Sequence, residues 1–235
     1  QPSAGGLVTG MSSFLAMMPQ LDGVPREHVW VGWPGESIDV SLHDRVRTEA
    51  ETGFHSHPVF LTQGEMDAFY LGFCNKTIWP LFHYFPSLTV YQESMWRQYQ
   101  HVNEVFCESV LQVVGPHDIV WVHDYHLLLL PRLLKQKAPH LLVGFFLHIP
   151  FPSFEIFRLL PGKWRGEILE GLLGSDLIGF HTYEYSQHFL QCVLRLLGHE
   201  HNMGQILTPE RVVKVSTFPM GIDYEKFAQA SRSSL

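Results

Sequence analysis

Histidine and aspartate side chains follow three apolar runs of the sequence, at the point where each run ends. His123 and Asp124 come after the first run, His148 after the second and His181 after the third, and a fourth run leads into a Gly-containing turn that ends at Asp223. In an open α/β sheet, ligands bind outside the carboxyl ends of the strands. If the runs are neighbouring strands, these hydrogen-bonding side chains line one crevice, which predicts a ligand site there.

Two other interpretations of these residues stay open. They are also ordinary turn and capping residues, and Asp124 would then cap a helix over residues 125–137. His123, His126 and His148 could instead be imagined as metal ligands, because the first two are three residues apart. A zinc site would need a convergent third ligand and a second shell, whereas histidines at strand ends more often donate hydrogen bonds.

Glycines and aromatic residues mark two further candidate sites. Gly5 and Gly6 precede an amphipathic segment, where backbone N–H groups at a helix start could approach an anion. Trp33 lies in a tight Gly-Trp-Pro-Gly turn, and Tyr70 and Trp79 are further large aromatics with polar edges. Such residues can form platforms that stack on sugars, although packing in the core is the commoner role of a single tryptophan.

The elements that must position these residues are predicted by hydrophobic periodicity. Apolar runs without alternation are expected for parallel strands that are covered on both faces. Strands alternating with helices predict an α/β fold with a doubly wound, mainly parallel sheet. The predicted strands are 29–31, 59–61, 119–122, 142–147, 177–180 and 212–218, and the predicted helices are about 91–114, one marked by Leu7, Met11, Phe14 and Met18, and one capped by Thr182.

Composition excludes several classes of protein. Of 235 residues, 46% are hydrophobic and 17% charged, so the chain can build a sizeable core and is not a disordered protein. The net charge of −7 without a basic stretch argues against nucleic acid and against anionic membranes as partners. No window of about 18 apolar residues predicts a membrane span, and the chain begins without a signal peptide. Three scattered cysteines predict buried free thiols in a reducing, cytoplasmic location.

A set of motifs that covers essentially the whole chain resembles trehalose-6-phosphate synthases. They occur in that family's order and at nearly its spacings, which makes the combination specific. The motifs are Ser3–Leu7, Gly32–Gly35, Trp79–Tyr84, Trp121–Leu127, Gly144–Pro152, Glu155–Phe157 and Phe218–Asp223.

The resemblance implies one half of a retaining glycosyltransferase with two Rossmann-like lobes that face a cleft. Such enzymes transfer glucose from UDP-glucose to glucose 6-phosphate and give trehalose 6-phosphate and UDP, without a cofactor or a metal. Residues 1–223 would be the amino-terminal, acceptor-binding lobe without the family's first strand, and residues 224–235 a linker or tail. The carboxyl-terminal nucleotide-sugar lobe would be absent.

The same resemblance assigns the acceptor side of the site. Tyr70 and Trp79 occupy acceptor positions, and Trp33 lies near the acceptor phosphate. Asp124 accepts hydrogen bonds from acceptor hydroxyls, a task that suits an ionised carboxylate because it is acceptor-only. Trp79 and Ile149 would shape which anomer of the acceptor fits.

On the donor side, the resemblance places His148 against the donor glucose near the reacting centre, and Gly5 and Gly6 along the UDP diphosphate or the donor sugar. Asp124 and His148 are thus the predicted catalytic residues. The arginine that contacts the acceptor phosphate in this family would precede Gln1, and the Arg and Lys that neutralise departing UDP would follow Asp223. The chain alone is therefore expected to be inactive, and the apolar face left by a missing lobe predicts self-association.

Two alternatives to this function stay open. One is a related synthase with a different phosphorylated acceptor, such as glycerol 3-phosphate, although Tyr70 and Trp79 favour a hexose phosphate. The other is a non-catalytic regulator that senses a sugar phosphate and lacks the residues that stabilise the leaving group.

Overall fold

A computed structural model of the chain describes residues 27–221 together with residues 11, 15, 224, 228 and 229. The chain divides into a large unit, Val29–Phe218, and a small unit formed by residues 1–28 and 219–235. The large unit carries the sheets and helices described below. Of the small unit, the structure describes residues 11, 15, 27, 28, 219–221, 224, 228 and 229, so the predicted helix around residues 7–18 lies mostly outside the described residues.

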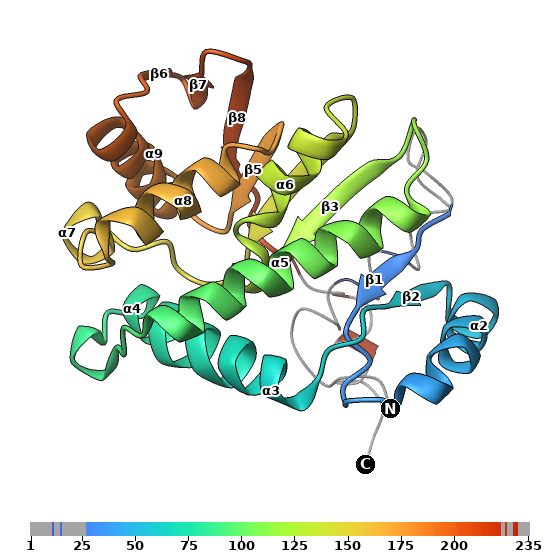
Figure 1. Cartoon of the computed structure of the whole chain (residues 1–235). Helices are drawn as coiled ribbons and strands as arrows, with labels where there is room; N and C mark the ends of the chain where they lie inside the picture. The colour runs from blue at the N-terminus through green and yellow to red at the C-terminus, as the bar shows by residue number, and fades with distance from the viewer. Residues whose placement is uncertain (1–10, 12–14, 16–26, 222–223, 225–227, 230–235) are drawn as a thin grey trace. The chain divides into compact units, whose positions relative to one another are not determined.

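The large unit is built on a six-stranded, mainly parallel sheet (Figure 1). Its first four strands are parallel, and the last two turn back as an antiparallel hairpin. The order across the sheet is β3 (Ile119–His123), β4 (Leu142–Leu147), β5 (Leu177–Phe180), β8 (Val212–Thr217), β7 (Gln205–Leu207) and β6 (His201–Asn202). The predicted α/β class with a mainly parallel sheet is confirmed, whereas the sequence analysis did not foresee the hairpin.

One face of this sheet packs against helices. Val143, Phe145 and Leu147 are buried on it, while Leu142 on the opposite face is 55% exposed and Trp121 beside it is 46% exposed. On that opposite face Phe146 and Gly179, at the carboxyl ends of β4 and β5, are buried, so among the described residues burial on both faces is limited to this end of the sheet. The helices α6 (Leu130–Lys137), α8 (Gly162–Leu172) and α9 (Tyr183–Leu197) each connect successive parallel strands, and right-handed crossovers place them on one side. Figure 1 shows α6 and α8 on the same side as α5 (Glu93–Val113).

A separate two-stranded parallel sheet pairs β1 (Trp30–Gly32) with β2 (Ser56–Pro58), with α2 (His43–Phe54) between them. The prediction of a strand over residues 59–61 is wrong in its bounds. The observed strand is Ser56–Pro58, and its pairing with β1 ends at Pro58. Only the N–H of Val59 still donates to the carbonyl of Gly32, at 2.8 Å. Proline cannot donate to a ladder, which explains why the strand ends there.

Aromatic residues join α5 to the segment before it. That segment consists of α3 (Gln63–Met66), the π-helix η3 (Asp67–Ile78) and α4 (Trp79–Phe82). Phe73 of η3 lies 4.5 Å from Tyr99, 5.1 Å from Trp96 and 5.7 Å from Trp164 between ring centroids. These four side chains are almost wholly buried, so they fix the position of η3 on α5 and α8.

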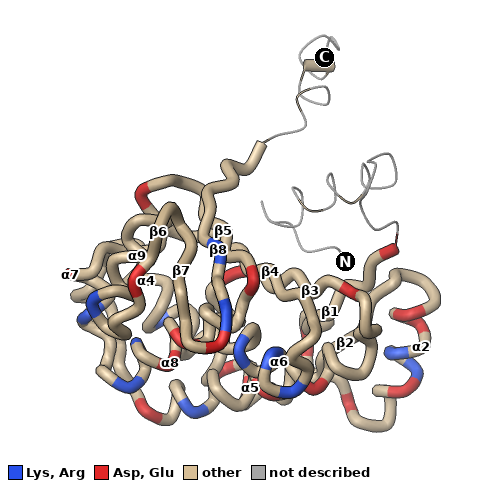
Figure 2. Tube along the Cα trace, turned by 90° about the horizontal axis from the view of Figure 1, so that it is seen from above, with Lys and Arg blue, Asp and Glu red and all other residues tan. Residues whose placement is uncertain are grey.

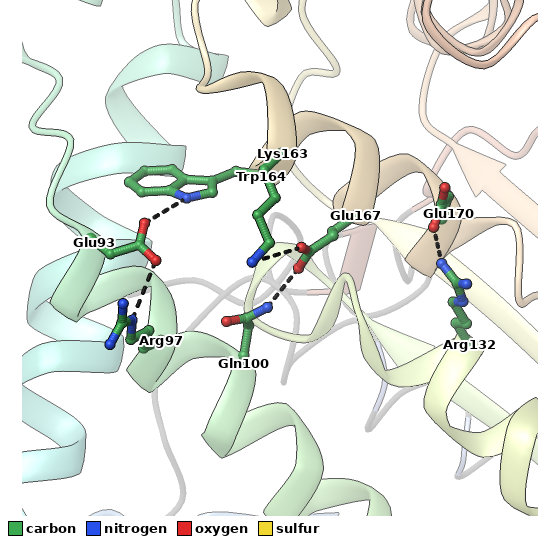
Figure 3. Close-up of polar contacts among 8 residues, drawn as sticks. All are labelled: Glu93, Arg97, Gln100, Arg132, Lys163, Trp164, Glu167 and Glu170. Atoms are coloured by element: carbon green, nitrogen blue, oxygen red, sulfur yellow. Dashed lines mark hydrogen bonds and ion pairs between the residues drawn. The ribbon is translucent and has the colours of Figure 1, made fainter.

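Polar contacts at the surface tie the same helices together (Figure 3). The indole N–H of Trp164 donates to Glu93 of α5 at 3.2 Å, and the amide of Gln100 donates to Glu167 of α8 at 2.6 Å. Arg132 of α6 pairs with Glu170 of α8. Exposed ion pairs contribute little free energy, so these contacts fix orientation more than stability.

Close packing of α6 on the end of α8 requires glycine. A Cβ on Gly174 would lie 2.2 Å from the backbone nitrogen of Arg132, whereas a Cβ on Gly166 within α8 would have no neighbour within 4 Å. We expect Gly174→Ala to lower the free energy of unfolding by about 1–3 kcal/mol or more. The matched control, Gly166→Ala, should raise it by roughly 0.5–1 kcal/mol, because alanine is the better helix former. Urea unfolding of both variants checks this, and equal effects would contradict the packing explanation.

The three cysteines are buried and free, as predicted. Cys74 lies in η3, Cys107 in α5 and Cys192 in α9. Burial raises the pKa of all three thiols, that of Cys192 to about 12. They are therefore unreactive, packed side chains.

The described surface shows no basic tract. Figure 2 shows Lys and Arg interspersed with Asp and Glu over the helices. Among the described helices, none combines the length and the apolar character that a bilayer span requires.

Candidate functional site

Asp124 adopts a strained backbone conformation directly after β3. Its φ of 70° and ψ of 172° lie in a region that is essentially restricted to glycine and costs about 1–3 kcal/mol for other residues. The backbone N–H of Asp124 donates to the carbonyl of Phe146 at 2.8 Å, and its carboxylate accepts from the N–H of His148 at 3.2 Å. These contacts hold the carboxylate at the end of β4.

The structure does not support a helix-capping role for Asp124. Its side chain makes no capping hydrogen bond to the short 3₁₀ turn η5 (Tyr125–Leu127), and α6 begins only at Leu130. The predicted helix over residues 125–137 is thus wrong in its first turns. Since backbone strain of this kind gathers at functional sites, Asp124 is the strongest single candidate in the described chain.

Burial sets the charge of this carboxyl group. It raises the pKa of Asp124 to about 6, against the lowering effect of the N–H groups of Tyr125 and His148 and of the nearby His83. At neutral pH Asp124 is therefore an ionised carboxylate in a poorly solvated position. Such a group binds hydroxyl donors strongly, because it has lost much of its hydration.

Three histidines form a row across the ends of β3, β4 and β5. Nδ1 of His123 lies 3.1 Å from Nε2 of His148, and the rings of His148 and His181 are 5.6 Å apart. Burial lowers the pKa of His123 and of His148 to about 4, and it also lowers the pKa of His181. All three are neutral at pH 7, so each ring offers one donor and one acceptor.

His123, His126 and His148, which were considered as metal ligands, do not converge on one point. His126 turns away to stack on Tyr70, with the ring centroids 5.5 Å apart. Among the residues that the structure describes, no group of three or more His, Cys, Asp or Glu side chains could hold a metal ion.

The π-helix η3 places Tyr70 and Trp79 on one side. In an α-helix, residues nine apart are separated by about two and a half turns and point in opposite directions. Hydrogen bonds between residues five apart widen the turn, so the same nine residues make about two turns and end on the same side. The exposures agree: Tyr70 is 39% exposed and Trp79, at the end of η3, 41%, while Phe69, Phe73 and Ile78 are buried.

Side chains of η3 and α4 approach Asp124 through intermediates. Asn75, between Tyr70 and Trp79, accepts a hydrogen bond of 3.3 Å from the hydroxyl of Tyr125, the residue after Asp124. Both Tyr70 and Asp124 act electrostatically on that hydroxyl. Trp79 stacks on His83 at 4.1 Å, and His83 in turn stabilises the charge of Asp124.

The structure therefore brings two of the predicted residues, Asp124 and His148, together at one rim of the sheet, and connects Tyr70 and Trp79 to them only indirectly. Asp124 and His148 touch directly, and the two aromatics are linked to them through Tyr125 and His83. The roles assigned to the four residues remain predictions.

The other predicted residues are placed less closely. Trp33 is half-buried against the core, and its buried indole N–H has no hydrogen-bond partner among the residues that the structure describes. Ile149 follows His148 and also packs against the core. Gly5 and Gly6 lie outside the described residues.

Sequence reasoning did not give Asn75, His83 or Tyr125 a part in the site. His83 and Tyr125 stand inside the motifs Trp79–Tyr84 and Trp121–Leu127, which is the signal that the sequence carries for them. Asn75 had no such signal, because its place between Tyr70 and Trp79 depends on the π-helix.

The buried histidines predict that acid destabilises the fold. Burial lowers the pKa of His123, His126 and His148 to about 4 in the folded chain, while in the unfolded chain each is near 6.5. The unfolded state therefore takes up protons first, and stability falls as the pH drops from about 6.5 to 4. Protonation of Asp124, whose pKa is raised to about 6, favours the folded chain over part of this range. Its contribution is smaller than the combined contribution of the three histidines.

His126→Phe isolates this effect. Of the three rings, His126 has lost the most contact with solvent. Between pH 7 and pH 4, the free energy of unfolding should therefore fall by up to about 3 kcal/mol less in the variant than in the parent. Urea unfolding at pH 7, 5.5 and 4.5 measures the difference. Parallel pH profiles of the two proteins would contradict the burial explanation.

Comparison with known proteins gives matches over the whole chain. The family model described as Glycosyltransferase family 20 matches residues 1–234. A bifunctional trehalose-6-phosphate synthase/phosphatase from Thermoproteus tenax is 48% identical over 234 residues, which are 98% of this chain and 31% of that protein. A UDP-forming alpha,alpha-trehalose-phosphate synthase from Pichia angusta is 42% identical over 231 residues, which are 96% of this chain and 46% of that protein.

Solved structures agree with these matches. The E. coli trehalose-6-phosphate protein bound with UDP-2-fluoro glucose has a TM-score of 0.83 and 30% identity, over 100% of this chain and 50% of that one. A UDP-forming synthase from Burkholderia xenovorans in complex with glucose-6-phosphate has a TM-score of 0.82 and 26% identity, over 98% and 49%. The chain thus spans about a third to a half of the proteins that it resembles.

Proposed function

The chain belongs to glycosyltransferase family 20, and from this premise we propose that it is the acceptor-binding half of a retaining, UDP-glucose-dependent glycosyltransferase. The reaction is transfer of glucose to glucose 6-phosphate, giving trehalose 6-phosphate and UDP. The observation that carries this proposal is Asp124, a buried and ionised carboxylate in a strained conformation, in direct contact with the backbone of His148. Relatives named as UDP-forming synthases support the choice of reaction.

The acceptor would bind between the aromatic residues and Asp124. Tyr70 and Trp79 offer ring faces for the apolar side of a hexose, and the carboxylate of Asp124 accepts hydrogen bonds from two of its hydroxyls. The free indole N–H of Trp33 suits a phosphate oxygen. Trp79, together with Ile149, would select the acceptor anomer.

Catalysis in this proposal rests on positioning and electrostatics. His148, which is neutral at pH 7, holds the donor glucose near the reacting centre, and Gly5 and Gly6 would lie along the UDP diphosphate or the donor sugar. The acceptor hydroxyl attacks the anomeric carbon from the face that UDP leaves, and a leaving phosphate oxygen takes the hydroxyl proton. Orientation of this kind can supply several kcal/mol of the barrier.

Release of UDP tests the proposal. We expect the 235-residue chain alone to release little or no UDP from UDP-glucose and glucose 6-phosphate. A chimera that joins the chain to the part of the Pichia angusta synthase after the matched region should release UDP only when glucose 6-phosphate is added. Turnover by the chain alone would contradict the assignment as an acceptor half, and a chimera that folds but stays inactive would contradict the proposed reaction.

Acceptor competition separates the proposed substrate from its rivals. Binding to the chain is measured by the change in tryptophan fluorescence, with glucose 6-phosphate and glycerol 3-phosphate as ligands. The aromatic side chains Tyr70 and Trp79 favour the hexose phosphate. Tighter binding of glycerol 3-phosphate would favour the related synthase, and tight hexose-phosphate binding with an inactive chimera would favour the sugar-phosphate sensor.

Three further predictions belong to this proposal. The lobe covers residues 1–223 and is followed by a linker, the protein acts in the cytoplasm, and the chain self-associates through exposed apolar surface. Ile119, Leu142 and Val212, on the face of the sheet opposite the helices α6, α8 and α9, are each at least half exposed. Analytical ultracentrifugation of the chain checks the self-association.

A further inference from the structure

His123 and His148 share one hydrogen bond between two neutral rings. Nδ1 of His123 faces Nε2 of His148 at 3.1 Å, across the ends of the adjacent parallel strands β3 and β4. The family assignment and the predicted site give His123 no role. Because only one hydrogen atom fits between two such nitrogens, one ring must donate and the other must accept.

The surroundings decide which ring donates. The backbone N–H of His148 donates to the carboxylate of Asp124, and Nδ1 is the ring nitrogen nearer to that backbone. A hydrogen on Nδ1 of His148 would lie on the backbone side of the ring and leave Nε2, which faces His123, as the acceptor. In this tautomer His123 is the donor.

Aromatic neighbours hold both rings in this arrangement. Trp121 lies 4.6 Å from the ring of His123, and Phe146 lies 4.7 Å and His181 5.6 Å from the ring of His148. Protonation of His148 at Nε2 would turn this contact into one between two donors for as long as His123 keeps its hydrogen on Nδ1. Burial keeps the pKa of both rings near 4, so the bond persists at neutral pH.

We propose that His123 is a positioning residue for His148: it donates its Nδ1–H to Nε2 of His148, fixes that ring, and keeps the hydrogen of His148 on Nδ1, where it can donate to a hexose oxygen. The part about the hexose rests on the proposed function, whereas the tautomer and the ring orientation do not. An unsupported neutral imidazole exchanges between two tautomers, and only one of them presents this donor.

The tautomer is measured on the 235-residue chain itself. ¹⁵N-histidine labelling at about pH 7.5 distinguishes a protonated from an unprotonated ring nitrogen by chemical shift. We expect His148 to carry its hydrogen on Nδ1 in the parent chain, and a mixture of both tautomers in His123→Phe. In His123→Asn the side-chain amide can donate in place of Nδ1 and should restore the parent signal.

His117→Phe is the matched control, because His117 is an exposed histidine that precedes the same strand β3. It should leave the His148 signals unchanged. A parent chain with the hydrogen on Nε2 of His148, or a His123→Phe chain with an unaltered tautomer, would overturn the proposal.

Kinetics of the chimera test the consequence for transfer. His123→Phe should lower kcat about 10- to 100-fold, with KM for glucose 6-phosphate changed less than about twofold, because neighbours that orient a functional histidine have effects of that size. His123→Asn should recover most of this loss. An equal loss in both variants, accompanied by a lower unfolding midpoint, would make His123 merely structural and overturn the proposal. A parent chimera without activity would contradict the proposed function and leave the tautomer result to decide on His123.

Discussion

Asp124→Asn is expected to lower kcat/KM of the chimera by roughly 30- to 1000-fold while it stabilises the folded chain. The kinetic loss corresponds to about 2–4 kcal/mol, the range for removing an oriented, charged hydrogen-bond partner of the transition state. Asparagine keeps the size of the side chain and one carbonyl oxygen, which can still accept from the N–H of His148. The variant therefore removes the charge and little else.

The gain in stability follows from the sign of the pKa shift. The fold raises the pKa of Asp124 from 3.8 to about 6, so it disfavours the ionised form. The contribution of Asp124 to stability is thus most favourable below about pH 4 and is lost as the pH rises through about 6, at a cost of up to about 3 kcal/mol at neutral pH. The Asp124→Asn variant would not bear this cost, so its thermal midpoint should exceed that of the parent at about pH 7.5 but not at about pH 4.

Activity should follow the same ionisation. Protonated Asp124 can no longer accept hydrogen bonds from two hydroxyl groups, so kcat/KM of the parent chimera should fall as the pH drops through about 6. In the Asp124→Asn variant this acid limb should be absent. Asp118→Asn is a suitable control, since Asp118 accepts from the N–H of Gly115 at 2.7 Å at the other end of β3. It should lose about 1 kcal/mol of stability and no activity.

A destabilised, fully active Asp124→Asn variant would overturn this account. That result would mean that Asp124 is a structural residue whose charge the fold requires. The sign of the stability change separates the two interpretations: removal of a charge that the fold disfavours raises stability, whereas removal of a charge that the fold requires lowers it.

The strands and their carboxyl-end residues could be predicted from the sequence. The four parallel strands of the main sheet stand close to their predicted positions, and Asp124 and His148 lie together as strand order requires. These strands could be predicted because an apolar run, and the polar residues that follow it, can be recognised within a short stretch of sequence. The hairpin of β6 and β7 was missed, because its strands have only two and three residues and only Ile206 is buried.

Other features depend on tertiary structure that local patterns do not encode. The hydrogen bond between His123 and His148 joins residues on two strands, and it needs the register of β3 and β4. The burial that raises the pKa of Asp124 arises only when the ends of β3 and β4 and the segments around them have packed together. The π-helix has no known sequence signature in residue spacing, so the common side of Tyr70 and Trp79 could not be derived from their separation along the chain.

Phe73→Ala is expected to show that tertiary packing maintains this π-helix. Phe73 is fully buried among Trp96, Tyr99 and Trp164, and its removal should lower the free energy of unfolding by about 3–5 kcal/mol. π-Helices are rare and mostly single turns, so we expect one of 12 residues such as η3 to depend on these packing contacts. When they weaken, Tyr70 and Trp79 lose their common side.

Acceptor binding should therefore weaken along with stability, although Phe73 itself is buried away from the ligand. Phe73→Leu, which keeps most of the volume, separates the two effects: the chain stays folded, and the change in tryptophan fluorescence with glucose 6-phosphate should require a higher ligand concentration. Phe54→Ala is the control, because Phe54 is 78% exposed at the end of α2 and should change neither property. Unchanged acceptor binding by a folded Phe73→Leu chain would mean that the aromatic pair keeps its alignment without the packing of η3, and the π-helix would then have no part in building the site.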